Sequence, residues 1–88
     1  MLYILTQDLK TVVCTSNIIS INIKRLKYDG QYIDSWEIYA TPSIETNPNI
    51  RLGIYNNESK CKNILMEIMY AIKAKSGAFF MPHKEEKI

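Results

Sequence analysis

The chain has 88 residues, of which 47% are hydrophobic, and its formal net charge is +2 at pH 7. That length fits one domain, and the apolar fraction is typical of a chain that folds. So small a net charge argues against a dedicated nucleic-acid surface or a polybasic membrane patch. No apolar run approaches the roughly 20 residues of a transmembrane helix, and the N-terminus lacks the basic lead-in of a signal peptide. We therefore expect a cytoplasmic protein without membrane contact.

The first residues predict a short hairpin. Residues 2–6 form an apolar run, residues 7–10 are mainly polar, and residues 11–14 form a second apolar run. Large aliphatic and aromatic residues favour strands, and polar residues between two such runs favour a turn.

The middle of the chain predicts three longer strands. Residues 18–26 alternate isoleucine with polar residues, which is the pattern of a strand with one buried face and one wet face. Asp29-Gly30 is a strong hairpin signal, so residues 33–41 are the expected returning strand. Residues 50–55 alternate again after a loop with two prolines. The side chains expected to face the core are Ile19, Ile21, Ile23, Trp36, Ile38, Ala40, Ile50, Leu52 and Ile54.

Residues 58–76 carry the only sustained helical rhythm. Asn57 is placed to cap the first turn of a helix. Gly77 follows the last turn, where a residue with left-handed backbone angles commonly ends a helix. The apolar stripe at helical spacing consists of Cys61, Ile64, Leu65, Ile68, Met69 and Ile72.

These elements predict an α+β fold. Successive strands with short connections favour an antiparallel meander of about five strands, and the long C-terminal helix covers one face of that sheet. Residues 78–82 are a short apolar run that fits either a final edge strand or a buried tail. We expect one domain over residues 1–82 and a flexible, charged tail over residues 83–88.

No catalytic, cofactor-binding or metal-binding constellation is recognisable. The two cysteines, Cys14 and Cys61, lack metal-ligand spacing, and we expect both to be reduced core residues unless their α-carbons come within about 7 Å. The only histidine, His83, has neither a nucleophile nor an orienting carboxylate nearby in the sequence. Enzyme chemistry is therefore not expected.

Two groups of residues suggest binding surfaces. A sheet face with tyrosines beside cations can stack bases and hold phosphates, although such tyrosines are also ordinary cross-strand partners. That group is Lys24, Arg25, Lys27, Tyr28, Tyr32 and Tyr39. An apolar arc wider than one small sheet needs can form a partner surface, or it can belong to a wider core. That second group is Met66, Met69, Tyr70, Phe79 and Phe80.

Short motifs resemble those of small uncharacterised proteins from Firmicutes genomes, their phages and mobile elements. The N-terminal strand, the Gln-Asp-x-Lys turn at residues 7–10, the Leu-Gly-x-Tyr strand at residues 52–55 and the capped helix carry the resemblance. It implies a phage or mobile-element origin in low-GC Gram-positive bacteria, and it transfers no catalytic residue.

Small size, the lack of a catalytic site and this resemblance favour a non-enzymatic protein that binds a protein partner stoichiometrically. Inhibition of a bacterial defence system is one hypothesis of that kind. The marginal core of a small domain also favours a homo-oligomer. The alternatives are a nucleic-acid-binding module that uses the open sheet face and a structural subunit of a larger assembly.

Overall fold

The structure is a computed structural model in which residues 1–83 are described. Its elements in chain order are β1 (Tyr3–Leu5), β2 (Val12–Cys14), the 3-10 helix η1 (Thr15–Asn17), β3 (Ile18–Tyr28), β4 (Gln31–Pro42), β5 (Ile50–Tyr55), α1 (Glu58–Lys73) and β6 (Ala78–Phe80). Every predicted strand and the predicted helix is present, so the α+β class holds.

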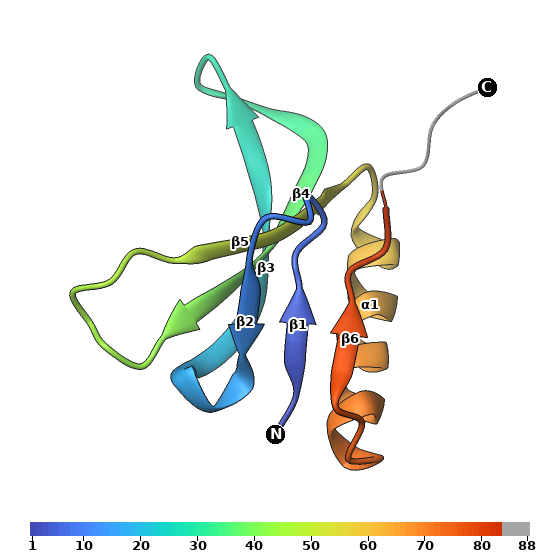
Figure 1. Cartoon of the computed structure of the whole chain (residues 1–88). Helices are drawn as coiled ribbons and strands as arrows, with labels where there is room; N and C mark the ends of the chain where they lie inside the picture. The colour runs from blue at the N-terminus through green and yellow to red at the C-terminus, as the bar shows by residue number, and fades with distance from the viewer. Residues whose placement is uncertain (84–88) are drawn as a thin grey trace.

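The strands form two sheets of three, and the prediction of one meander of about five strands was wrong. The larger sheet is antiparallel, in the order β3–β4–β5. The smaller sheet has the order β2–β1–β6, and β6 runs parallel to β1 (Figure 1). The meander fails because η1 separates β2 from β3, so β2 pairs only with β1. The short apolar run after the helix then takes the free side of β1.

The core lies between the two sheets and α1. It contains buried side chains from all three: Leu2, Ile4, Val13, Ile38, Ala40, Leu52, Tyr55, Cys61, Ile64, Ile68 and Met81. A chain this short buries a limited apolar area, so each of these side chains is a large share of the driving force for folding.

Bulges change which side chains face this core. One bulge between Ile18 and Ser20 leaves Ile19 70% exposed, although the alternation predicted it to be inward. Another irregularity, between β4 and β5, shifts the alternation in β5. Tyr55 is therefore buried in the core, and Ile54, which was predicted to face the core, lies beside Glu37 on the opposite face of the sheet. Each extra residue moves the following side chains to the opposite face, which a strict period of two cannot foresee.

The helix ends are set by its caps. Asn57 is the N-cap, as predicted, and its side chain accepts a hydrogen bond of 2.7 Å from the Lys60 N–H. The helix ends at Lys73, earlier than predicted, and Lys75 has φ +58°. Backbone hydrogen bonds of the Schellman type close the last turn. The left-handed position therefore belongs to Lys75, and its assignment to Gly77 was wrong.

The hairpin of β3 and β4 extends beyond the core as an arm (Figure 1). Its two-residue turn is the predicted one, with φ of +53° at Asp29 and +79° at Gly30. Both positive values match a type I′ turn, whose twist suits a hairpin.

The two cysteines are free thiols. Cys61 is buried in the core, as predicted, whereas Cys14 is only half-buried and lies 3.1 Å from the Ser16 hydroxyl. Within residues 1–83, no helix is both long and apolar enough to cross a membrane. Of the predicted charged tail, only His83 falls within the described residues, and it is exposed.

Candidate functional site

One edge of the larger sheet is closed by a single glutamine. The Gln7 N–H donates to the Leu52 carbonyl at 2.8 Å. Its side-chain Oε1 accepts from the Ile54 N–H, and its Nε2 donates to the Ile54 carbonyl, both at 2.9 Å. The amide group of Gln7 therefore takes the place of a residue in a neighbouring strand. It satisfies the outward backbone groups of β5 at positions 52–54.

The turn between β1 and β2 holds Gln7 in place. The Thr6 hydroxyl donates to Asp8 Oδ1 at 2.7 Å, and the Thr11 N–H donates back to that hydroxyl at 3.2 Å. The hydrogen bond from Thr6 lowers the pKa of Asp8 below its ordinary value. The Lys10 N–H also donates to Asp8 Oδ1. This is the predicted Gln-Asp-x-Lys turn. Local sequence patterns do not show that its glutamine hydrogen-bonds to a distant strand.

The opposite edge of the same sheet, formed by β3, has no strand partner among the described residues. In an antiparallel ladder, every second residue of an edge strand directs its N–H and C=O away from the partner. Within residues 1–83, the one backbone hydrogen bond that β3 makes outside the β4 ladder is at its start, where the Ile18 N–H donates to the Thr15 carbonyl. The regular stretch between the two bulges of β3 runs from Ser20 to Arg25.

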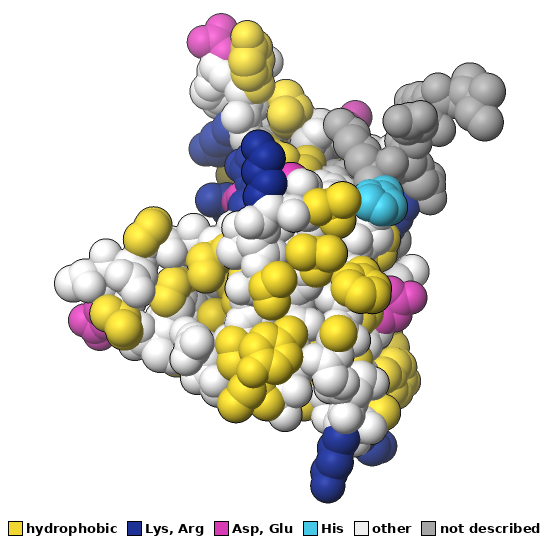
Figure 2. Space-filling view, in the orientation of Figure 1, with side chains coloured by type: hydrophobic (Ala, Val, Ile, Leu, Met, Phe, Trp, Pro, Cys, Tyr) yellow, Lys and Arg dark blue, Asp and Glu magenta, His cyan; other side chains and the backbone are white. Residues whose placement is uncertain are grey.

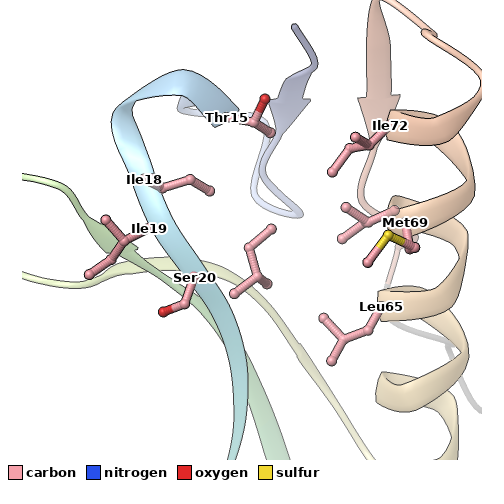
Figure 3. Close-up of a pocket in the computed structure, with 9 residues that line it drawn as sticks. Thr15, Ile18, Ile19, Ser20, Leu65, Met69 and Ile72 are labelled. Atoms are coloured by element: carbon pink, nitrogen blue, oxygen red, sulfur yellow. The ribbon is translucent and has the colours of Figure 1, made fainter.

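A groove of about 410 Å³ lies between the start of β3 and one flank of α1 (Figure 3). Leu65, Met69 and Ile72 project from the helix toward β3 across this groove. Seven of its nine lining residues are apolar, and none is titratable. The full set is Thr15, Ile18, Ile19, Ser20, Ile21, Leu65, Ile68, Met69 and Ile72.

The rim of the groove exposes large apolar side chains to solvent. Met69 is 64% exposed and Ile72 46%. Ile19 is 70% exposed where β3 begins, and its side chain points away from α1 (Figure 3). Single exposed apolar residues are ordinary, but several around one concave apolar site are typical of a binding surface.

The structure does not gather the five predicted partner-binding residues into one patch. Met69 lines the groove, whereas Met66 and Tyr70 are exposed farther round the helix. Phe79 packs against the core, and Phe80 is exposed on the smaller sheet. Sequence reasoning missed Ile19, Leu65 and Ile72, because isoleucine alternation and the helical stripe assigned all three to the core.

Phe80 belongs to a second apolar surface, the outer face of the smaller sheet. Strand pairing aligns the outward residues, and hydrophobic side chains gather over β1, β2 and β6 in Figure 2. These residues are Tyr3, Leu5, Val12, Cys14, Ala78 and Phe80. Each strand is only three residues long, so this face is small.

Two of the predicted nucleic-acid residues lie on the outer face of the larger sheet. Lys24 forms an ion pair of 3.2 Å with Glu37 and stacks 5.2 Å from the centre of the Tyr39 ring. Glu37 is 5% exposed and also pairs with Arg51. One buried carboxylate therefore neutralises part of the charge of two cations, and the tyrosine ring is already in contact with a lysine.

The remaining predicted nucleic-acid residues lie on the hairpin arm. Arg25 pairs with Asp34 at 3.1 Å and stacks 5.1 Å from the Trp36 ring. Lys27 lies 4.7 Å from the centre of the Tyr32 ring. Tyr28, beside the turn, is exposed. The two subsets therefore do not form one continuous face of stacked aromatics and free cations.

The described part of the chain shows no metal-binding cluster of side chains. Within residues 1–83, no group of three or more His, Cys, Asp or Glu side chains is placed to hold a metal ion. No family model, curated protein or solved structure matches the chain. The resemblance to Firmicutes and phage proteins therefore stays a prediction.

Proposed function

We propose that this chain is a non-enzymatic protein-binding module and that the groove between α1 and β3 is its binding surface. The observation that carries the proposal is the coincidence of two unsatisfied features at one place. The unpaired backbone edge of β3 borders an apolar groove with exposed isoleucine and methionine side chains. A protein partner satisfies both features at once, since it supplies backbone hydrogen bonds and apolar side chains.

The other apolar surface is less suited to this role. Three strands about 4.8 Å apart, each advancing about 3.3 Å per residue, give the smaller sheet a face of roughly 150 Å². A stable interface needs about 800 Å² from each partner. That face also offers no row of backbone hydrogen-bonding groups, so it has less to add to binding.

Nucleic acid is the weaker alternative because three of the four cations on the larger sheet form ion pairs within the chain. Glu37 and Asp34 pair with Lys24, Arg51 and Arg25. Binding of phosphates would require these pairs to be exchanged, at the cost of leaving the buried Glu37 unpaired. We expect no mobility shift with single- or double-stranded oligonucleotides at about 0.15 M salt.

Two methionines of α1 supply a matched test of the groove. Met69 lines the groove and is 64% exposed, whereas Met66 is outside it and 55% exposed. Peptides are selected from a random display library on the wild-type chain and then tested on Met69→Lys and Met66→Lys. We expect Met69→Lys to weaken the selected peptides about tenfold or more, and Met66→Lys to change them less than about twofold.

Peptides that bind Met69→Lys as well as wild type, or a selection that yields no binder, would contradict the proposal. A salt-sensitive mobility shift that is lost on neutralising Lys24 would favour the nucleic-acid alternative instead. Cytoplasmic location, a phage or mobile-element origin, inhibition of a defence system and homo-oligomerisation are finer proposals supported by sequence reasoning alone.

A further inference from the structure

Building on the proposed function, we infer that the partner segment is an extended strand that pairs with β3 from Ser20 to Arg25. On the face that looks toward α1, its alternate side chains are apolar where they enter the groove and are carboxylates farther along, at the level of Arg25 and Lys27. The groove thus receives the core-facing side of an added strand, a fourth one in the larger sheet.

The backbone of β3 defines where this strand pairs. The bulge between Ile18 and Ser20 and the irregularity between Arg25 and Lys27 interrupt the regular ladder on either side. Between them, the outward N–H and C=O groups repeat with the spacing that a second strand requires. The opposite edge cannot accept a strand at the same level, because Gln7 already occupies the groups of Leu52 and Ile54.

The faces of β3 set the apolar side of the added strand. Ile21 and Ile23 pack against the core, so the face that they share is the apolar one. A strand beside β3 in the same pleat directs every second side chain to that face. These side chains would meet Leu65 and Met69 on the flank of α1. The extended segment therefore needs apolar residues at alternate positions.

Charge sets the chemistry at the other end of the strand, where Arg25 and Lys27 both stack on the Tyr32 ring and so share one face of the hairpin arm. β3 contains Lys24, Arg25 and Lys27 but no acidic residue. Within residues 1–83, Lys27 makes no ion pair, and its ammonium group stacks over the Tyr32 ring. An edge strand with several cations at one end attracts a segment with carboxylates at the same level.

The same charges argue against a second copy of β3 as the occupant. Antiparallel pairing about Ile23, which keeps the core-facing sides of both copies on one face, would place Lys24 beside Asn22 and Arg25 beside Ile21. Neither cation would gain a carboxylate, since β3 has none to offer. A different protein with an apolar and acidic strand fits the edge better.

A synthetic peptide tests this geometry: valine alternates with threonine in one half, and glutamate takes the place of valine in the other half. It is labelled with fluorescein and titrated with the intact chain by anisotropy. One control peptide has the same composition in blocks, and another is N-methylated on alternate residues, which removes the N–H groups along one edge of the strand. We expect each control to bind about tenfold more weakly than the parent peptide or worse.

Protein variants test the charge. Lys27→Glu should weaken the parent peptide by about tenfold, whereas Lys10→Glu, the same charge change in the turn at the closed edge, should change binding less than about twofold. Equal binding of the parent and N-methylated peptides would overturn the inference. So would dimerisation of the free chain that Met69→Lys abolishes and the parent peptide fails to compete.

Failure of this inference is distinguishable from failure of the proposed function. If displayed peptides depend on Met69 but carry apolar residues at helical spacing, the groove binds a helix, and the strand inference is wrong while the proposed function stands. If no displayed peptide depends on Met69, both are wrong.

Discussion

The two edges of the larger sheet differ in how their backbone groups are treated. On β5, Gln7 satisfies the outward groups of Leu52 and Ile54 with one backbone and two side-chain hydrogen bonds. On β3, the regular stretch between the bulges keeps its outward groups unpaired in the described structure and borders an apolar groove. Both edges belong to one sheet, so the difference comes from the residues beside each edge and not from the type of sheet.

The open edge of β3 is therefore not simply the default for a small sheet. Unpaired edges invite association, and proteins usually blunt them with charges, bulges or covering segments. Here β5 is covered at positions 52–54, whereas β3 has an irregularity near each end and carries its cations, Lys24, Arg25 and Lys27, in the half toward the hairpin turn. The regular stretch begins at the groove, where Ser20 and Ile21 lie across from the exposed side chains of Met69 and Ile72. An interaction site is the natural interpretation of that placement.

The largest effect is expected from opening the closed edge. Gln7→Ala removes three side-chain hydrogen bonds, two with Ile54 and a longer one of 3.4 Å to the Pro82 carbonyl. The Ile54 N–H and C=O lose their partner, so the free energy of unfolding should fall by about 2–3 kcal/mol. Gln31→Ala, at an exposed position beside the hairpin turn, should change it by less than about 0.5 kcal/mol. Urea denaturation measures both. Equal effects would show that Gln7 does not close the edge.

A smaller loss is expected from crowding Tyr55 on the same strand. A Cβ at Gly53 would lie 2.8 Å from Tyr55 Oη and 2.9 Å from Cε2. That hydroxyl donates to the Pro82 carbonyl at 2.7 Å, so displacement of the ring also loosens the segment after β6. Gly53→Ala should cost about 1–3 kcal/mol.

Gly77 supplies the control for this change. A Cβ there meets nothing within 4 Å, so thermal unfolding of Gly77→Ala should stay close to wild type. A Gly53→Ala variant as stable as Gly77→Ala would contradict the packing described for Tyr55.

A pH-dependent effect is expected from the core that both edges share. Burial raises the pKa of the Cys61 thiol above its ordinary value. The unfolded chain therefore loses this proton at lower pH than the folded chain does. Stability is complete below the thiol pKa of the unfolded chain and falls as pH rises above it. Between about pH 8 and pH 9.5, the free energy of unfolding should decline more steeply with Cys61 than in Cys61→Ala.

The measurement is made in a Cys14→Ser background, because the hydrogen bond with Ser16 lowers the pKa of Cys14 and so acts in the opposite direction. Parallel pH profiles for Cys61 and Cys61→Ala chains would contradict the assignment of the decline to this thiol.

The smallest effect is expected at the open edge itself. Met69→Lys and Met66→Lys both replace exposed side chains, so each should change the free energy of unfolding by less than about 0.5 kcal/mol in the free protein. Chemical denaturation checks this directly. A large loss for Met69→Lys alone would mean that the groove is part of the core rather than a surface kept for a partner.

Local sequence patterns predicted the elements well, because alternation and helical spacing are properties of neighbouring residues. Asn57 and the Asp29-Gly30 turn are examples in which a side chain or backbone preference acts within a few positions. The sheet order could not be predicted in the same way. The pairing of β1 with β6 joins residues that are 75 positions apart, such as Tyr3 with Ala78. A short apolar run does not show which distant strand it will join.

The candidate site was predictable only in part. The apolar arc of the helix drew attention to Met69, but the same arc included Met66 and Tyr70, which lie outside the groove. The exposure of Ile19 could not be predicted, because it results from a bulge that depends on the pairing of β3 with β4. The role of Gln7 depends on contacts with Ile54, which is 47 positions away.

Backbone amide hydrogen exchange measures the difference between the edges most directly. In the free protein, the Ile54 amide should be protected, and alternate amides from Ser20 to Arg25 should exchange rapidly. A bound peptide that depends on Met69 should slow those outward β3 amides and leave Ile54 unchanged. Outward β3 amides that are already protected in the free chain, or that keep their exchange rates when the peptide binds, would contradict the account.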